Sequence, residues 1–375
     1  MPTVEVEDTI ATLVPANNGA GPLWCYGSPS IARLGDDVMV CVSDADPGLD
    51  RLCNTRWSVY SRDDAGWHAR RHGEYFDERE PCPLAILSGK LMVSVNPLLD
   101  PLSEERAGPC LPHVLQFDMA DLNRPPIDRM PTWDRTYDSF CEHSYRGLGI
   151  DIDAQHLLLL NIDGHDGYAW SLMDADGTWS RNGFLSFPIR ACYPQVALHG
   201  GAAHIMAIGD ILETNREWMA YKRQKTGNDW DYDFRRLFYT WSPDIRAGDF
   251  GEPIEIKSYE DTAGYIRNLD MWIDPSGAVH ILYATRNIWH DFMRDQFFPD
   301  EPLISTLEHR VLRQGEIVGG TTIATYDSDA SESSVKGPFF NAGGFHCAPD
   351  GPLRAVFSAG HEGISRARLA SAQNM

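Results

Sequence analysis

Two histidines stand on either side of one short predicted hairpin. His143 lies in the run Cys141–Gly147, and His165 lies in the run Asp163–Gly167. Because the second strand of a hairpin returns to the end at which the first strand began, we expect the two imidazoles to face each other there. Facing imidazoles can supply a general base and a partner for a carboxylate. The competing interpretation is a pair of surface histidines that bond only to backbone groups.

A third candidate for chemistry is a tyrosine at the start of the next predicted hairpin. Tyr193 stands in the run Ala191–Pro194, where its phenol could donate a proton to a departing sugar oxygen or simply pack on a neighbour. Tyr221 and Arg236 flank a later run, Trp230–Arg236. The alternation of apolar and charged residues in that run predicts an outer strand.

Four further residues stand where predicted inner strands begin or end, and they are candidates for binding substrate: Arg146, Tyr265, Arg267 and Arg286. The chain carries 32 Lys and Arg against 54 Asp and Glu, a net charge of −22. A protein this acidic repels phosphate backbones and anionic membranes, so nucleic-acid and membrane binding are not expected. An acidic protein that collects Arg, His and Tyr around one opening is expected to bind an anion there.

The eight cysteines are scattered and form no CxxC pair. Such cysteines are typical of small buried hydrophobes in a reducing compartment, and no disulfide is predicted. The first residues show no basic and apolar signal sequence, and no apolar run reaches transmembrane length. We therefore expect a cytoplasmic or periplasmic protein.

One supersecondary pattern recurs along the chain and must position these residues. It is a hairpin of two strands around a polar turn rich in Asp and Gly, which is typical of antiparallel sheets. Six copies are visible, at intervals of roughly 45–75 residues, as in propeller blades with variable outer loops. Their strand pairs are 30–34 with 38–42, 83–87 with 91–95, 147–151 with 157–160, 195–198 with 204–208, 270–273 with 279–283, and 345–348 with 353–358.

This repeat predicts an all-β fold, a β-propeller of seven four-stranded blades that forms a single domain over residues 1–375. The seventh hairpin is expected in Pro109–Leu122, around His113–Phe117, and Val4–Val14 is expected to supply the outer strand that closes the last blade. A pair of β-sandwiches is the alternative architecture. In a propeller the candidate residues would gather at one mouth of the central channel, where a sugar-binding pocket is expected.

These motifs resemble a known family. The stretch from His143–Gly147 through Asn161–His165, followed by Tyr193–Leu198 and Trp230–Tyr239, looks like the seven-bladed BNR-type propellers. That family includes ulvan lyases, rhamnosyl-glucuronate lyases and α-L-rhamnosidases. The resemblance covers about residues 140–300, and it implies a site for L-rhamnose linked to the 4-position of a glucuronate.

The resemblance also implies roles. Family lyases use two histidines about one hairpin apart, which His143 and His165 match, together with a Tyr and an Arg. Tyr193 matches by its position, although its hairpin ends at Asp210. Tyr221 and Arg236 are close to the family in spacing, but we expect both to lie on outer strands. The identity of the acid therefore stays open. No cofactor is required, and the structural metal found in some relatives has no ligands that this sequence identifies.

Three functions follow. The first is a polysaccharide or oligosaccharide lyase that cleaves the rhamnosyl-α-1,4-glucuronate linkage by β-elimination. The second is an α-L-rhamnosidase-type hydrolase acting on the same linkage, which would need a pair of carboxylates. The third is a non-catalytic sugar-binding propeller. The carboxylates available to the hydrolase are Asp166, Asp210 and Glu213.

Motifs for other chemistries are absent from the sequence. It contains no Gly-rich phosphate loop, no nucleophile elbow, no HExxH and no dinucleotide fingerprint. His346, Cys347 and His361 could meet on the last hairpin as metal ligands, but they do not make a full ligand set.

Overall fold

The structure is a computed structural model. It describes residues 7–21, 28–141, 145–164, 167–228, 232–328, 340, 342–347, 351–361 and 364–371, with the backbone alone at 232, 360–361 and 364–371. The chain divides into two compact units, unit 1 (Met1–Ser186) and unit 2 (Phe187–Met375). The expected single-domain organisation stays a prediction.

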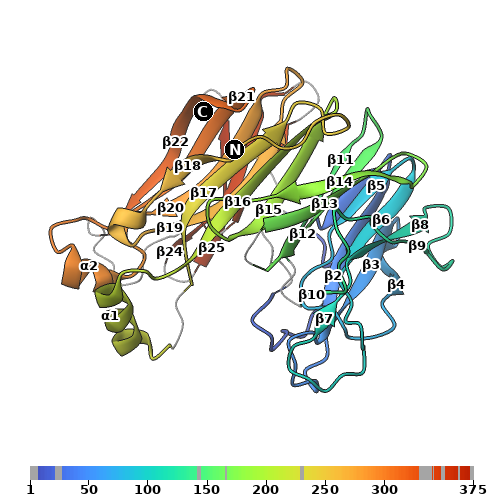
Figure 1. Cartoon of the computed structure of the whole chain (residues 1–375), viewed down its shortest axis with the longest axis horizontal. Helices are drawn as coiled ribbons and strands as arrows, with labels where there is room; N and C mark the ends of the chain where they lie inside the picture. The colour runs from blue at the N-terminus through green and yellow to red at the C-terminus, as the bar shows by residue number, and fades with distance from the viewer. Residues whose placement is uncertain are drawn as a thin grey trace. The chain divides into compact units, whose positions relative to one another are not determined.

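Over its described residues, unit 1 contains three four-stranded antiparallel sheets, each with its strands in chain order (Figure 1). The first sheet is made of β1 (Ile31–Leu34), β2 (Asp37–Ala45), β3 (Thr55–Asp63) and β4 (Gly66–His72). The second is made of β5 (Leu84–Leu87), β6 (Lys90–Val95), β8 (His113–Asp118) and β9 (Ile127–Arg129). The third is made of β11 (Arg146–Asp151), β12 (His156–Asp163), β13 (Gly167–Met173) and β14 (Trp179–Leu185). A short ladder joins β7 (Pro109–Cys110) to β10 (Phe140–Cys141).

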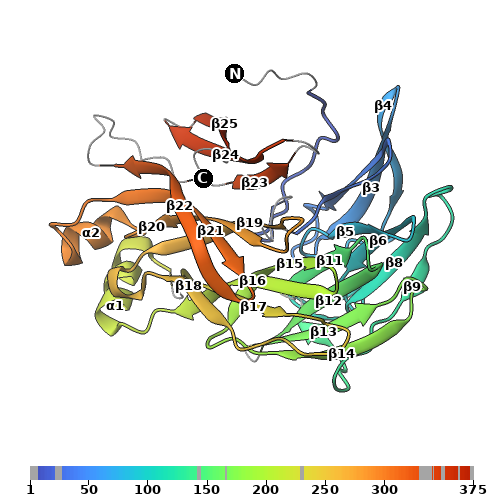
Figure 2. The ribbon, with the colours of Figure 1, turned by 90° about the horizontal axis from the view of Figure 1, so that it is seen from above.

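Unit 2 repeats this design and adds two α-helices (Figure 2). Its first sheet is made of β15 (Ala191–His199), β16 (Ala202–Leu212), β17 (Tyr232–Ser242) and β18 (Ile254–Ser258). Its second is made of β19 (Tyr265–Ile273), β20 (Val279–Arg286), β21 (Ile304–Arg313) and β22 (Glu316–Asp327). Three strands form the last described sheet: β23 (Ala342–Cys347), β24 (Leu353–His361) and β25 (Ile364–Ser371). Up-and-down sheets of four strands are the form that propeller blades take.

The six predicted hairpins are confirmed as β1–β2, β5–β6, β11–β12, β15–β16, β19–β20 and β23–β24. Two of them turn on a pair of residues with positive φ. These pairs are Ser88–Gly89, with φ of 50° and 69°, and Gly200–Gly201, with φ of 60° and 89°. Two positive φ values match the right-handed twist of the flanking strands, so these turns close their hairpins tightly.

The seventh hairpin expected in Pro109–Leu122 is not formed there. His113 pairs with Val95, so β8 is the third strand of the second sheet. The apolar alternation of this segment correctly indicates a strand. It does not say which strand is the neighbour, so the position of β8 within the second sheet was not predicted. Of the expected closing strand Val4–Val14, residues 7–14 are described and form no strand.

The inner strands of unit 1 are apolar on both faces because each sheet packs against a neighbour. On β6, Leu91 and Val93 belong to a core shared with the first sheet, whereas Met92 belongs to a core shared with the third sheet. Successive side chains of a strand point to opposite faces, so one strand serves both cores. Each fully buried side chain of this size contributes about 1.5–3 kcal/mol.

Both helices connect strands at one end of the unit 2 sheets. Helix α1 (Arg216–Thr226) joins β16 to β17, and α2 (Asp291–Phe297) joins β20 to β21. The side chain of Asn215 caps α1 by accepting hydrogen bonds from two backbone N–H groups of the first turn. The expectation that Tyr221 lies on an outer strand is wrong, because it lies within α1. No helix in the described part of the chain is long and apolar enough to cross a bilayer.

Candidate functional site

The two predicted catalytic histidines, His143 and His165, lie outside the described residues. Their hairpin, β11–β12, is described from Tyr145 to Gly164. The backbone N–H of Ile162 donates a hydrogen bond to the carbonyl of Tyr145, 2.9 Å away. The roles assigned to both histidines stay predictions.

Arg146, expected to bind substrate, is buried within unit 1. It is 1% exposed and forms an ion pair with Glu78, at 3.2 Å between Nη1 and Oε2. It also donates to the carbonyl oxygens of Glu80 and Pro81. Burial raises the pKa of Glu78, and the Arg146 charge opposes this shift. In the described structure Arg146 therefore ties the loop before β5 to the start of β11.

In unit 2, we define the open edge as the end of the sheets where β15, β17 and β19 begin and β16 and β20 finish. Register places Ala191 opposite Gly209 and Tyr265 opposite Arg286. The residues that precede one inner strand and follow the next therefore meet there, as the sequence predicted. Both helices lie at this edge because they connect these strand ends.

Tyr193 lies on distorted backbone at the open edge of unit 2. Its φ is 50°, a left-handed conformation that costs a non-glycine residue about 1–3 kcal/mol. The pairing of β15 with β16 shifts register between Cys192 and Gln195, which marks a β-bulge. Asn268 of β19 donates a hydrogen bond from Nδ2 to the Tyr193 carbonyl, 2.7 Å away. Strain of this kind persists only where the surroundings hold it, so the fold positions Tyr193.

A row of aromatic rings runs along the same edge. The ring of Phe234 contacts Tyr193 edge-on at 5.6 Å and Tyr265 at 5.7 Å. Tyr265 stacks on Trp289 with 4.1 Å between ring centroids. Tyr193 is 3% exposed, whereas Tyr265 and Trp289 are half-buried. Aromatic faces of this kind suit the apolar faces of sugar rings.

Two predicted cations stand beside this row. Arg286 is 7% exposed and pairs with Asp291, the first residue of α2, at 2.7 Å. Arg267 is half-buried on β19, opposite Ala284 of β20. Arg286 therefore fixes the connection that carries Trp289, while Arg267 adds positive charge to the same pair of strands.

A buried group of four charges anchors α1 to the open edge, and we call it the charge quartet: Glu213, Lys222, Asp233 and Arg235. Lys222 lies 3.3 Å from Glu213 and also pairs with Asp233. Arg235 pairs with Glu213 at 2.5 Å and with Asp233 at 2.7 Å. Burial opposes ionisation of Glu213, but the hydrogen bond and charge of Arg235, together with the Asn215 N–H and the Lys222 charge, hold the pKa of Glu213 below its usual range.

The remaining candidates have other surroundings. Tyr221 packs edge-on against Phe292 and Phe297 of α2, at 6.0 and 5.4 Å. Arg236 pairs with Glu255 on β18 and lies over the ring of Phe238 at 4.8 Å. None of these contacts joins Tyr221 or Arg236 to the aromatic row of Tyr193, Phe234 and Tyr265.

The carboxylates expected for a hydrolase are already engaged where they are described. Asp210 is 8% exposed and pairs with Arg190. Glu213 belongs to the charge quartet, and Asp166 lies outside the described residues.

The metal ligands suggested on the last hairpin do not meet. His346 pairs with Arg354 across β23 and β24, and His361 lies seven residues further along β24. At the usual rise of a strand, seven residues span roughly 23 Å. Across the described residues, no group of three or more His, Cys, Asp and Glu side chains is placed to hold a metal ion.

Sequence reasoning missed Phe234 and the ion pairs that join Glu213 to Lys222 and Arg235. Phe234 was hidden in the charged run that leads into β17, and its contacts come from β15 and β19. The hairpin pattern places Asn268 at the start of a predicted inner strand, and its bond to the Tyr193 carbonyl joins β19 to β15.

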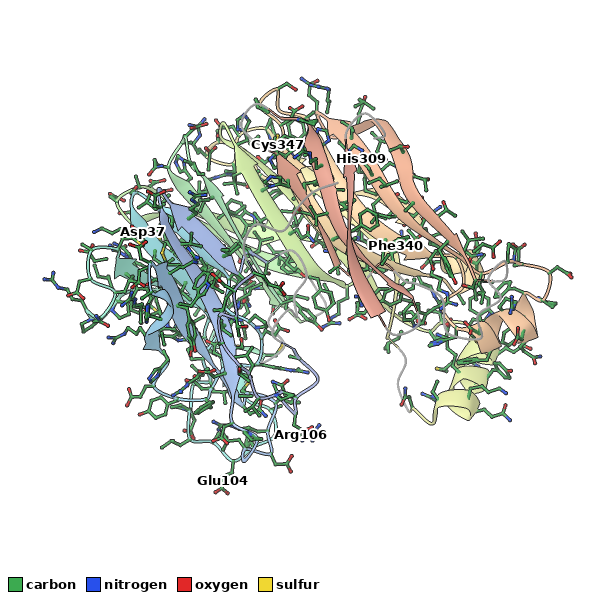
Figure 3. All side chains as sticks on the ribbon, turned by 180° about the vertical axis from the view of Figure 1, so that it is seen from behind. Asp37, Glu104, Arg106, His309, Phe340 and Cys347 are labelled. Carbon is green, nitrogen blue, oxygen red and sulfur yellow. The ribbon has the colours of Figure 1, made fainter. Side chains whose placement is uncertain are left out.

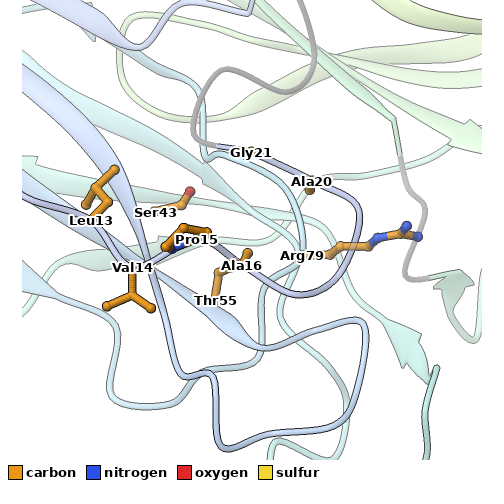
Figure 4. A pocket seen from close by; sticks show the side chains of 9 residues that line it. All are labelled: Leu13, Val14, Pro15, Ala16, Ala20, Gly21, Ser43, Thr55 and Arg79. Carbon is orange, nitrogen blue, oxygen red and sulfur yellow. The ribbon is translucent and has the colours of Figure 1, made fainter.

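An apolar pocket of about 180 Å³ lies elsewhere, in unit 1 (Figure 4). The segment Leu13–Gly21 covers it, and Ser43, Thr55 and Arg79 complete its lining. None of the predicted site residues belongs to it.

No protein-family model matches the sequence, and no curated protein matches it. Similar solved structures exist. A polysaccharide lyase family 25 ulvan lyase with bound GlcA(1-4)Rha3S is 12% identical with a TM-score of 0.53, and the match covers 94% of this chain and 85% of that one. A second structure of ulvan lyase gives a TM-score of 0.52, with the same identity and coverage. A Trypanosoma rangeli sialidase is 10% identical with a TM-score of 0.45, over 93% of this chain and 55% of that one. The chain thus shares the fold of the ulvan lyases.

Proposed function

We propose that this chain is a carbohydrate-active enzyme, a lyase that cleaves the rhamnosyl-α-1,4-glucuronate linkage by β-elimination. The observation that carries the proposal is the setting of Tyr193. A tyrosine held in strained backbone, beside an aromatic row and two arginines, suits a proton donor next to a sugar that bears a carboxylate. The fold shared with ulvan lyases supports the same substrate class.

In this proposal a base removes the proton from C5 of the uronate. The electron pair of that C–H bond forms the C4–C5 double bond, the bond from C4 to the rhamnosyl oxygen breaks, and an acid protonates the departing oxygen. Positive charge must stabilise the carboxylate as C5 is deprotonated. We assign His143 as base, His165 as carboxylate partner and Tyr193 as acid.

Arg267 and Arg286 hold the anion in this proposal. Both arginines lie on the β19–β20 pair that also carries Tyr265, and Arg286 pairs with Asp291 as well. Arg146 is buried against Glu78, so its part in binding is to fix the backbone three residues after His143. No metal ion or organic cofactor is assigned a step.

The hydrolase alternative has less support from the described residues. Glycoside hydrolysis needs two carboxylates flanking the scissile bond. Asp210 and Glu213 are both held in buried ion pairs, which leaves them poorly placed to exchange protons with a sugar.

The test is incubation with a rhamnosyl-glucuronate oligosaccharide. A lyase produces the ultraviolet absorbance of a C4–C5 double bond as rhamnose is released. Release of rhamnose without that absorbance, and with heavy-oxygen label from water at its anomeric carbon, would establish the hydrolase instead. Binding without release would indicate a non-catalytic sugar-binding protein.

A further inference from the structure

Three loops of unit 1 are held together by one buried arginine. The loops are residues 46–54, 73–83 and 96–108. Arg51 is 8% exposed, and it donates hydrogen bonds to the carbonyl of Phe76 at 2.8 Å and to that of Pro101 at 2.9 Å. A guanidinium with five donors can satisfy several carbonyls at once, so it fixes the relative positions of these loops.

The three loops line a depression of about 510 Å³ that is open to solvent on one side, and we call it the loop cavity. Its volume lies within the range of small-molecule sites, roughly 300–1,000 Å³. Apolar side chains and carboxylates line it together: Leu49, Tyr75, Leu102, Asp50, Glu74 and Glu104. Figure 3 shows Glu104 on a loop at the far end of unit 1 from the Asp37 turn.

The lining is chemically selective. Tyr75 is 38% exposed and Leu102 is 74% exposed, so both offer apolar surface to a ligand. The charge of Glu74, the preceding residue, and a hydrogen bond to Glu74 raise the pKa of Tyr75. Carboxylates accept hydrogen bonds from sugar hydroxyls but repel a second anion. The arginine among the lining residues already bonds to carbonyls, so negative charge prevails.

The loop cavity is connected to the hairpin that carries the predicted base. Residues of the 73–83 loop line the cavity, and Glu78 of that loop forms the buried ion pair with Arg146. Arg146 opens β11, three residues after His143 in the sequence. A ligand held in the loop cavity therefore lies on the same loop framework as the start of that strand.

We propose that the loop cavity is a binding site for an uncharged, unsulfated pyranoside unit of the substrate. This inference rests on the proposed function and deepens it. A polymer that alternates neutral and anionic sugars would place its neutral unit on Tyr75 and Leu102, and the carboxylates would exclude a uronate or a sulfate ester. The cavity would thus determine which sugar of the polymer lies at each position along the protein.

The experiment is a ligand-observed NMR titration of the full chain with two probes, methyl α-L-rhamnopyranoside and its 3-O-sulfate. The neutral probe is expected to bind in the millimolar range, and the sulfate about tenfold more weakly. Tyr75→Ala is expected to weaken binding of the neutral probe by about fivefold with an unchanged melting temperature. In the double variant Glu74→Gln and Glu104→Gln, the affinity for the neutral probe is expected to exceed the affinity for the sulfate by only about threefold.

A charge control comes from Asp64→Asn, in the exposed turn between β3 and β4, which should leave both affinities unchanged. Equal binding of both probes, or neutral-probe binding that Tyr75→Ala does not weaken, would overturn the inference. Assays for the C4–C5 double bond keep the two proposals separate. Tyr75-dependent binding without elimination retains the loop cavity and rejects the lyase. If the protein catalyses elimination, Tyr75→Ala leaves KM unchanged and probe binding does not depend on Tyr75, then the lyase is retained and the loop cavity is rejected.

Discussion

The loops of unit 1 and the open edge of unit 2 are fixed in different ways. In unit 1, Arg51 and Arg146 tie irregular loops together through backbone carbonyls, with Glu78 as the carboxylate partner of Arg146. In unit 2, two helices lie at the strand ends, and the charge quartet holds α1 in place. The first arrangement depends on single side chains, whereas the second shares each carboxylate between two cations.

This difference predicts different sensitivity to mutation. Removing Arg146 leaves the buried Glu78 without its cation, and removing Arg51 leaves backbone carbonyls without their donor. Removing one cation from the quartet leaves the other cation paired with both carboxylates. Unit 1 should therefore lose more stability from one such substitution than unit 2. Substitution of the strained Tyr193 in unit 2 should lower the turnover rate more than the stability.

The largest effect is expected from Arg146→Met. It leaves Glu78 buried without its cation, with the Asn96 N–H still donating to it, which should lower the free energy of unfolding by about 3–5 kcal/mol. Lys222→Met should cost less, about 2 kcal/mol, because Arg235 still pairs with both quartet carboxylates. Guanidinium chloride unfolding measures both. Arg124→Met, at a largely exposed arginine paired with Asp121, is the control and should cost less than about 0.5 kcal/mol. Equal losses from Arg146→Met and Lys222→Met would remove the distinction between the units.

The second effect concerns rate. His143→Ala should lower turnover by a factor on the order of 100 or more, with a stability loss of at most about 1 kcal/mol. Tyr193→Phe keeps the ring packed against Phe234 but removes the proton donor, so it should lower kcat similarly while preserving the melting temperature. His165→Ala should impair binding as well as rate, because it removes a partner of the carboxylate. Initial rates and melting temperatures separate these cases. A His143→Ala protein with normal activity would rule out this base.

The third effect is acid sensitivity, and buried groups of the two units should change stability in opposite directions as the pH falls. In unit 2, burial lowers the pKa values of His204 and His309 to about 4. The unfolded chain binds these protons near pH 6.5, so stability falls as the pH drops from about 6.5 to 4, on the order of 2 kcal/mol for each imidazole. In unit 1, burial and then the Glu78 charge raise the pKa of Asp77 to about 7. The folded state binds this proton first, so stability rises over the fall from pH 7 to about 4.

Hydrogen exchange at pH 6.5 and 4.5, followed peptide by peptide, measures this contrast. Relative to the intrinsic exchange rate of an unprotected amide at each pH, strands β16 and β21, which carry His204 and His309, should lose protection at the lower pH. The 73–83 loop, which carries Asp77, should keep its protection at the lower pH. His309→Gln should reduce the acid sensitivity of β21, since the amide does not titrate. An equal loss of protection in both units would show that acid destabilises the whole protein, and that these individual groups do not determine the response.

The sequence predicted the inner hairpins well because their signals are local. Turns such as Ser88–Gly89 and the apolar runs beside them lie within ten residues of one another. The partner of Arg146 could not be found this way, since Glu78 is 68 residues away in the chain. Helix α1 was missed because its packed face carries only two aromatic residues, Trp218 and Tyr221, beside the buried Lys222, which is too short an apolar pattern to mark a helix. The bulge at Tyr193 depends on Asn268, and no periodicity encodes a contact between sheets.

The smallest effect expected tests how unit 2 holds Tyr193. Asn268→Ala removes the donor to the Tyr193 carbonyl, and the net loss of stability should be about 1 kcal/mol. If that bond maintains the strained φ, the phenol will shift from the position that protonates the leaving oxygen. We expect kcat to fall about tenfold with KM nearly unchanged, because the interaction acts in the transition state. Asn287→Ala is the matched control, because it also removes an amide bonded to a backbone carbonyl, that of Pro302 at 2.8 Å. It should lower the melting temperature similarly and leave kcat intact. In a Tyr193→Phe background, Asn268→Ala should cause no further loss of rate, because the group that it positions is already missing. A further tenfold loss in that background would mean that Asn268 acts on the rate by a route other than Tyr193.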